Sequence, residues 1–200
     1  MNAQFKKSII CIFLAAAFLS PLKSQQVTAE FISKHPPAKL ISGEQVWDGI
    51  QNIYLDNDRL FVIDVWAGLQ ILDVSDVKNP KELGSFTTDN RTNNIFIDDH
   101  YTYLSNTVGG VLLLDTSDPK NIKQTGKLKT KGDAYWVAAK FPFVFTAETD
   151  KGVAVYDISN PEFPMERGRF ETGGWAWSLY LDGDLLYVGD KKKGDVQLFS

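Results

Sequence analysis

Side chains whose types and spacing could support chemistry recur at a fixed interval along this 200-residue chain. Asp73, Asp115 and Asp157 lie 42 residues apart, and each is followed two residues later by serine. Such carboxylates could hold a metal ion, or each could accept backbone hydrogen bonds and close a tight turn. Because every repeat needs the same turn, the recurrence favours the structural role, and we expect neither a metal nor another cofactor.

Other signatures of catalysis are sparse. The two histidines, His35 and His100, have no carboxylate or cysteine at ligand spacing. The sequence also contains no Gly-rich phosphate loop, no zinc-binding helix with paired histidines and no nucleophile elbow. These observations argue against the common nucleotide-dependent and hydrolytic chemistries.

A repeat positions the three aspartates. Each aspartate ends an apolar run that begins with a glycine, at Gly68, Gly110 or Gly152. Gly194 begins a fourth, weaker copy. A fixed period of roughly 20 to 50 residues indicates a repeat architecture. The fold must therefore be inferred from one repeat unit and the way its copies stack.

Each repeat has the pattern of four short strands, most clearly in the first copy, where we expect strands at 50–55, 60–65, 69–74 and 81–87. The second and third strands are almost wholly apolar, as in strands buried on both faces. The fourth is polar and alternating, which is typical of an outer edge. Four strands in about 42 residues predict an all-β fold, a β-propeller of four blades over residues 38–200 without helices. A β-solenoid is the alternative, but its coils are shorter.

The repeat resembles a known family. Three runs, Leu-Gln-Ile-Leu-Asp, Val-Leu-Leu-Leu-Asp and Val-Ala-Val-Tyr-Asp, each follow glycine and precede a serine-containing turn. They are similar to the LVIVD repeat, over about residues 50–200. The fourth copy departs from the pattern, because Ser200 stands where the aspartate belongs. The resemblance implies an exported or surface-associated bacterial or archaeal β-propeller, and no enzymatic signature comes with it.

The number of strands leaves closure of the ring open. Four sets of first to third strands are followed by only three fourth strands. Residues 38–45 resemble a fourth strand and could complete the last blade from the N-terminus. The alternative is that the chain is part of a longer array.

The N-terminus has the pattern of an export signal. Lys6 and Lys7 precede an apolar run over residues 9–19, which is shorter than the roughly 20 residues of a membrane span. We expect a signal peptide over residues 1–24, with Ala29 as the alternative cleavage position, and a linker over 25–37. The only cysteine, Cys11, lies inside the signal. The protein is therefore expected to be exported, to the periplasm, cell surface or extracellular space, with no stable membrane span after signal removal.

The formal charge of −4 and the absence of a basic stripe argue against a nucleic-acid partner. The one run of like charges, residues 191–193, is expected to solvate a loop tip.

Sorting residues by face gives the strongest binding signal. In an antiparallel blade, the turn into the first strand and the turn between the second and third strands lie on the same face. Aromatic residues and an arginine gather at these turns, and acids end three of the second strands. The predicted ligand-binding residues are Trp47, Asp64, Trp66, Arg91, Tyr135, Trp136, Glu148, Trp175, Trp177 and Asp190.

Two interpretations of this set are open. The tryptophans could be wedges between blades, or they could line an aromatic, acid-rimmed mouth over the central channel, suited to a protein, peptide or glycan. The preferred function is a non-enzymatic binding or scaffold module at the cell envelope. The alternative is an envelope hydrolase or lyase that uses Asp64, Glu148 and Asp190, which would need one carboxylate with a raised pKa.

Overall fold

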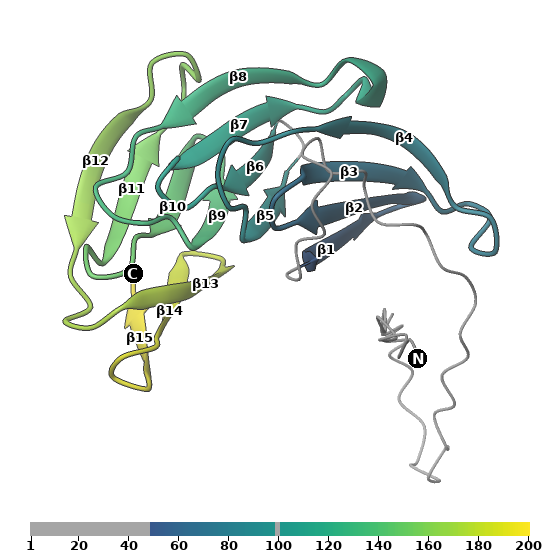
Figure 1. Ribbon diagram of the computed structural model, residues 1–200. Helices are drawn as coiled ribbons and strands as arrows, with labels where there is room; N and C mark the ends of the chain where they lie inside the picture. The colour runs from purple at the N-terminus through teal and green to yellow at the C-terminus, as the bar shows by residue number, and fades with distance from the viewer. Residues whose placement is uncertain (1–48, 99–100) are drawn as a thin grey trace, which may run out of the picture.

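The computed structural model describes residues 49–98 and 101–200 (Figure 1), and these residues form 15 strands and one short 3-10 helix. All strands lie in antiparallel sheets, and sequence neighbours pair with one another. The predicted all-β fold of four propeller blades is confirmed. The predicted signal peptide, the linker, Trp47 and the strand expected at 38–45 lie outside the described residues.

Three blades have four described strands and the last has three. Blade 1 comprises β1 (Ile50–Asp56), β2 (Arg59–Asp64), β3 (Gly68–Asp73) and β4 (Lys81–Phe86). Blade 2 comprises β5 (Asn94–Ile97), β6 (Thr102–Ser105), β7 (Val111–Asp115) and β8 (Lys123–Leu128), with the 3-10 helix η1 (Pro119–Asn121) in its last turn. Blade 3 comprises β9 (Trp136–Lys140), β10 (Phe143–Ala147), β11 (Val153–Asp157) and β12 (Met165–Phe170). Blade 4 comprises β13 (Ala176–Asp182), β14 (Leu185–Asp190) and β15 (Asp195–Phe199).

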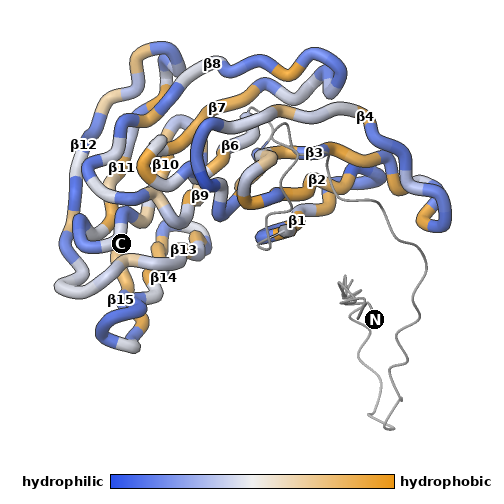
Figure 2. Tube along the Cα trace, in the orientation of Figure 1, coloured by the Kyte–Doolittle hydropathy of each residue, from blue (hydrophilic) through white to orange (hydrophobic). Residues whose placement is uncertain are grey.

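Hydrophobic side chains on both faces of each sheet hold neighbouring blades together. We call the surface of a blade that packs on the next blade its leading face, and the opposite surface its trailing face. At the first junction, the leading face of blade 1 contributes Phe61, Ile63, Leu69 and Ile71. The trailing face of blade 2 contributes Ile95, Leu104, Leu112 and Leu114. Burial of each such side chain contributes roughly 1.5–3 kcal/mol, so these junctions are the main stabilising feature. Figure 2 shows the resulting contrast between hydrophobic β7 or β11 and hydrophilic β12.

The blades follow one another along an open arc. The first strands of neighbouring blades pack on one another: β1 on β5, β5 on β9 and β9 on β13. Among the described residues no comparable packing joins β13 to β1, and Figure 1 shows the two ends of the arc apart. Blade 4 therefore has a covered trailing face and an uncovered leading face.

The glycine in each fourth strand is explained by this packing. A Cβ atom at Gly84 would clash with the carbonyl oxygen of Pro119, and one at Gly126 would clash with that of Pro161. Both prolines lie in the last turn of the next blade, so that turn rests directly on the glycine backbone. Gly168 occupies the same position in β12, where no such turn follows, and a Cβ atom there would meet nothing within 4 Å.

This difference gives a test of the junctions. Gly126→Ala should lower the free energy of unfolding by about 2–4 kcal/mol, because two backbones must separate. The matched variant Gly168→Ala should leave it within about 1 kcal/mol, with a tendency to stabilise. Urea denaturation of both variants measures the difference, and equal effects would show that the turn does not pack as described.

Candidate ligand-binding face

The repeated aspartates at the ends of the third strands close turns. The amide of Ser75 donates to Oδ1 of Asp73 at 2.9 Å, that of Ser117 to Asp115 at 3.0 Å, and that of Ser159 to Asp157 at 2.8 Å. These are the hydrogen bonds that the predicted turn requires. Hydrogen bonds from the serines lower the pKa of all three carboxyl groups. Within the described part of the chain, no three acidic, histidine or cysteine side chains come together as metal ligands would.

The second acidic series, at the ends of the second strands, also binds backbone. Oδ1 of Asp64 accepts hydrogen bonds from the amides of Trp66 and Ala67, at 3.0 and 2.9 Å. Oδ1 of Asp190 likewise accepts from the amides of Lys192 and Lys193, at 2.9 and 2.8 Å. Each carboxylate thus caps the turn between the second and third strands of its blade.

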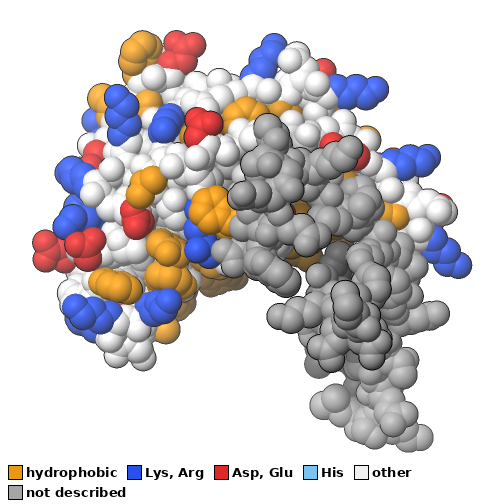
Figure 3. All heavy atoms as spheres, viewed as in Figure 1, with side chains coloured by type: hydrophobic (Ala, Val, Ile, Leu, Met, Phe, Trp, Pro, Cys, Tyr) orange, Lys and Arg blue, Asp and Glu red, His pale blue; other side chains and the backbone are white. Residues whose placement is uncertain are grey.

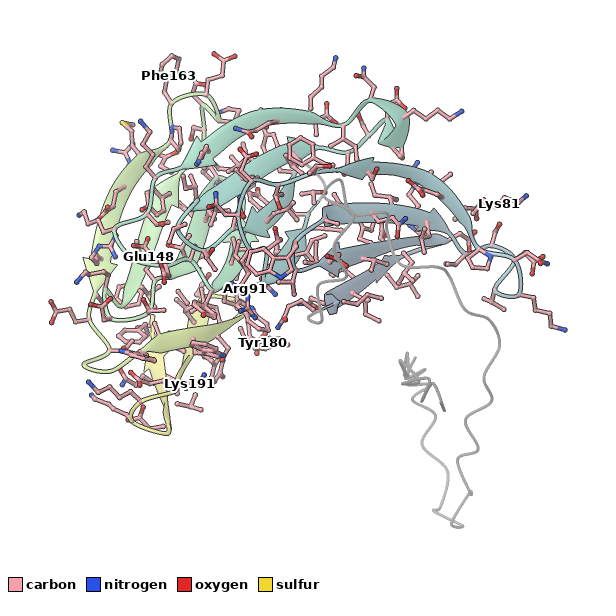
Figure 4. The ribbon with its side chains drawn as sticks, in the orientation of Figure 1. Lys81, Arg91, Glu148, Phe163, Tyr180 and Lys191 are labelled. Carbon is pink, nitrogen blue, oxygen red and sulfur yellow. The ribbon has the colours of Figure 1, made fainter. Side chains whose placement is uncertain are left out.

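Glu148, the member of this series in blade 3, is fully buried. Its Oε2 accepts from the amide of Lys131 at 2.9 Å and from Nη1 of Arg169 at 2.8 Å. Its Oε1 accepts from the hydroxyl groups of Thr146 and Tyr156, at 2.8 and 3.1 Å. A buried carboxylate is tolerated when it is paired and its lone pairs are satisfied, as here. Figure 4 shows Glu148 within blade 3.

These contacts differ from the expectation of an acidic rim. Glu148 is 0% and Asp190 only 3% exposed, so neither carboxylate reaches the surface, and Asp64 is the one acid of the three that is half-exposed. Burial would raise the pKa of Asp190, but hydrogen bonds, chiefly from the backbone amide of Lys193, outweigh burial and hold that pKa below its usual value. A general acid needs the opposite shift. Asp190 therefore gives no support to the hydrolase or lyase alternative, and the buried carboxylate of Glu148 is already paired with Arg169.

The aromatic residues on this face fall into two groups. Trp66, in the turn between β2 and β3, is 42% exposed, and Trp175, just before β13, is 43% exposed. Trp136 is half-buried and packs against the hydrophobic cluster between blades 3 and 4, which is the wedge role considered from the sequence. None of these three is fully buried, and Trp66 and Trp175 present ring surface to solvent.

Trp177 is fixed on both sides of its ring. Its centroid lies 3.9 Å from that of Tyr135 in a stacked arrangement, and Nζ of Lys191 lies 3.6 Å from the same centroid. Groups so close to one centroid must occupy opposite faces of the ring. The cation–π contact and the stacking brace this part of blade 4, since each is worth about 0.5–1.5 kcal/mol.

Further contacts tie these turns together. The amide of Trp175 donates to Oδ1 of Asp190 at 2.9 Å, and the amide of Lys191 donates to the carbonyl of Trp175 at 3.0 Å. Arg91, before β5, is half-buried, and its Nε donates to Oδ1 of Asn93 at 3.2 Å. Figure 4 labels Arg91 and Lys191, which come from blades 2 and 4.

Lys191 also lies on this face, although the sequence did not predict it there. It was expected to solvate a loop tip, although it is exposed in the turn between β14 and β15, on the same face as the aromatics. Its position directly after Asp190, a residue already placed on that face, was the available signal.

The buried ion pair in blade 3 yields a matched test. Arg169→Met should lower the free energy of unfolding by about 2–3 kcal/mol, because it leaves the buried Glu148 carboxylate without its cation. The control is Arg167→Met in the same strand, which removes an exposed pair with Asp157 and should have little effect. Urea denaturation compares the two, and a similar small loss in both would contradict the assigned role of Glu148.

The turn between β11 and β12 should stabilise the protein in a pH-dependent way. Hydrogen bonds from the amide and hydroxyl of Ser159, and then from Arg167, lower the pKa of Asp157 to about 2. Its stabilising contribution is therefore present above the unfolded pKa of about 3.9 and is lost as the pH falls towards the folded value. An NMR titration of the carboxyl carbon should give the low value, and Arg167→Met should raise it. A value near that of a free aspartate in both proteins would disprove the contacts.

Comparison with known proteins agrees with this geometry. The LVIVD repeat family matches residues 50–88, 131–172 and 173–196. Among curated proteins there is no significant match. Solved structures with a similar fold include a computationally designed protein, Ika4, with a TM-score of 0.66 and 11% identity, over 86% of this chain and 98% of that one.

Two further solved structures are also similar in fold. BamB from Moraxella catarrhalis has a TM-score of 0.52 and 13% identity, over 76% of this chain and 43% of that chain. The β-propeller domain of Cps50 (Swd1) from Myceliophteria thermophila has a TM-score of 0.57 and 10% identity, over 74% of this chain and 50% of that chain. The present chain thus spans about half the length of either. At these identities the likeness shows the fold alone. Because the LVIVD matches cover more than half of the residues and the matched segments form propeller blades, the chain belongs to the LVIVD repeat family.

Proposed function

We propose that this protein is a non-enzymatic binding or scaffold module of the cell envelope, which recognises a protein, peptide or glycan. The binding surface is the aromatic face, defined as Trp66, Arg91, Tyr135, Trp175, Trp177 and Lys191. The observation that carries the proposal is the exposure of Trp66 and Trp175 at turns on this one side of the blades. Large aromatic rings left in water are costly, and their exposure on one side of the blades is a feature of interaction sites.

The two exposed rings and the braced ones have different roles in this proposal. Trp66 and Trp175 have free ring surface on which a sugar ring or an apolar side chain can pack. Trp177 is held between Tyr135 and Lys191, so it supports the surface rather than stacking on the ligand. A surface fixed before binding loses less conformational entropy when the ligand arrives.

The polar groups on the aromatic face favour a ligand that is rich in hydrogen-bond acceptors. Because the carboxylates of Glu148 and Asp190 are buried, the accessible charges include Lys191 and the half-buried Arg91. Both side chains only donate hydrogen bonds. Glycan hydroxyl or carboxylate oxygens and peptide carbonyl groups are suitable acceptors.

An envelope location is supported by the signal pattern of residues 1–24 and by the exported character that the LVIVD resemblance implies. In the part of the chain that the structure describes, none of the helical segments has the length and hydropathy of a membrane span.

Tryptophan fluorescence tests this function. Acrylamide should quench wild-type emission, and Trp66→Phe and Trp175→Phe should each remove a quenchable component, because these two rings are exposed. In a panel of envelope glycans and peptides, one class should protect the emission from quenching. Trp66→Ala and Trp175→Ala should each weaken its binding about 10-fold or more.

Phe163→Ala is the matched control, since Phe163 is 70% exposed but lies in the turn after β11, away from the aromatic face. Loss of binding in this control, or binding that is unchanged in both tryptophan variants, would contradict the proposed surface.

A further inference from the structure

Arg91 is a half-buried cation without an acidic partner. Its Nε donates to Oδ1 of Asn93 at 3.2 Å, and among the described residues it forms no ion pair, even with the exposed Asp89 two residues earlier. A charge that is partly removed from water is costly unless an opposite charge or hydrogen-bond acceptors compensate it. The terminal nitrogens of this guanidinium are therefore donors that an anion could use.

Asn93 holds this cation in place and is itself incompletely bonded. It is 6% exposed, and its Oδ1 is occupied by Arg91. Its buried Nδ2 has no hydrogen-bond partner in the part of the chain that the structure describes. An unpaired buried donor costs about 1–3 kcal/mol. Because Nδ2 and Oδ1 belong to one amide, Nδ2 lies close to the guanidinium, and the two side chains form a cluster of nitrogen donors that lacks an acceptor.

The backbone at Asn93 repeats in every blade, whereas its side chain does not. The amide of Asn93 donates to the carbonyl of Ser105 at 2.9 Å, although Asn94 is the residue paired with Ser105, so the first strand begins with one extra residue. The extra residues of the other blades are Gln51, Tyr135 and Trp177. Such bulges re-aim one side chain and are frequent next to active sites. The fold requires the bulge but does not require an asparagine there.

Backbone contacts place the donor cluster beside an exposed ring. The amide of Thr92 donates to the carbonyl of Val65 at 2.9 Å. Arg91 and Trp66 adjoin these two residues in sequence, so the guanidinium and the 42% exposed ring come from turns that touch. An aromatic ring can pack on the apolar face of a sugar, and a guanidinium binds a carboxylate through two parallel hydrogen bonds.

The net charge of the surface would not by itself attract an anion. Acidic and basic side chains are interspersed over the face of the molecule that Figure 3 shows, and the formal charge of the chain is −4. A general positive field is therefore not the means of recognition. A carboxylate would instead be recognised at short range, by one cation and the donors beside it.

We propose that Trp66, Arg91 and Asn93 form a subsite for a sugar unit that carries a carboxylate, a hexuronate. This inference rests on the function proposed above and specifies its ligand as an acidic glycan. The carboxylate supplies the acceptors that the guanidinium and Nδ2 of Asn93 lack, Asn93 orients Arg91, and the sugar packs on Trp66. An acidic peptide fits less well, because an aspartate or glutamate side chain brings a carboxylate but no apolar face for the ring.

Isothermal titration calorimetry with an oligogalacturonate tests this subsite. The wild-type protein should bind it, and a methyl-esterified oligomer of the same length, which lacks the charge, should bind about 10-fold or more weakly. Arg91→Gln should weaken binding of the acidic oligomer about 10-fold or more and leave binding of the ester unchanged. Arg59→Gln is the matched control, because Arg59 is an exposed arginine at the start of β2, on the opposite side of blade 1, and should have no effect.

Asn93→Asp tests the positioning role of the amide. It places a carboxylate of the protein next to Arg91, so that an internal ion pair fills the subsite, and the acidic oligomer should no longer bind. Thermal unfolding checks that this variant keeps its fold, and if it does not, Arg91→Gln decides alone.

The outcomes separate this subsite from the proposed function. If Arg91→Gln binds the acidic oligomer like the wild type while Trp66→Ala weakens it, the subsite is wrong and the aromatic face stands. Equal binding of the ester, or of an oligoglutamate of matched charge, would likewise overturn the assignment to a sugar carboxylate. A wild-type protein that binds no glycan and no peptide would contradict both the subsite and the proposed function.

Discussion

The packing of one blade's leading face on the next blade's trailing face is the interaction on which this structure depends. The middle strands are apolar on both sides, so an isolated blade would expose two hydrophobic sheet surfaces to water. Stacking removes both surfaces from water, as at the junction of Phe61 and Ile71 with Ile95 and Leu114. The same contact sets local features of the repeat. The close approach of a turn to Gly84 and Gly126 leaves no room for a side chain, and the aspartate turns keep third and fourth strands in register.

The candidate site follows from that stacking rather than from a motif. Every blade has the same order and direction of strands. The turns that lead into the first strands and those between second and third strands therefore lie on one side of the arc. Residues far apart in sequence, such as Trp66 and Trp175, therefore reach the same side. The carboxylates of Asp64 and Asp190 on this side accept hydrogen bonds from backbone amides. The proposed ligand would instead contact the aromatic rings and the cationic side chains. Stability and recognition thus use different side chains of the same turns.

The repeat, its strands and the direction of the turns could be predicted from the sequence, because they depend on local pattern and a 42-residue period. The surroundings of Glu148 could not. Its cation, Arg169, comes from the outer strand of the blade, and its amide donors come from the turn that precedes the blade, so only the folded sheet reveals the burial. The position of Lys191 over Trp177 depends in the same way on how two turns meet. The open arc was also beyond the sequence, since curvature arises from the angle between blades.

Amide hydrogen exchange tests the central claim most directly, because local protection reports how firmly each blade is held. If blades are stabilised by neighbours on both faces, the middle strands of blades 2 and 3 should exchange most slowly. Blade 4, which packs against a neighbouring blade on one face only among the described residues, should exchange faster. Protection that is the same in every blade would contradict the account.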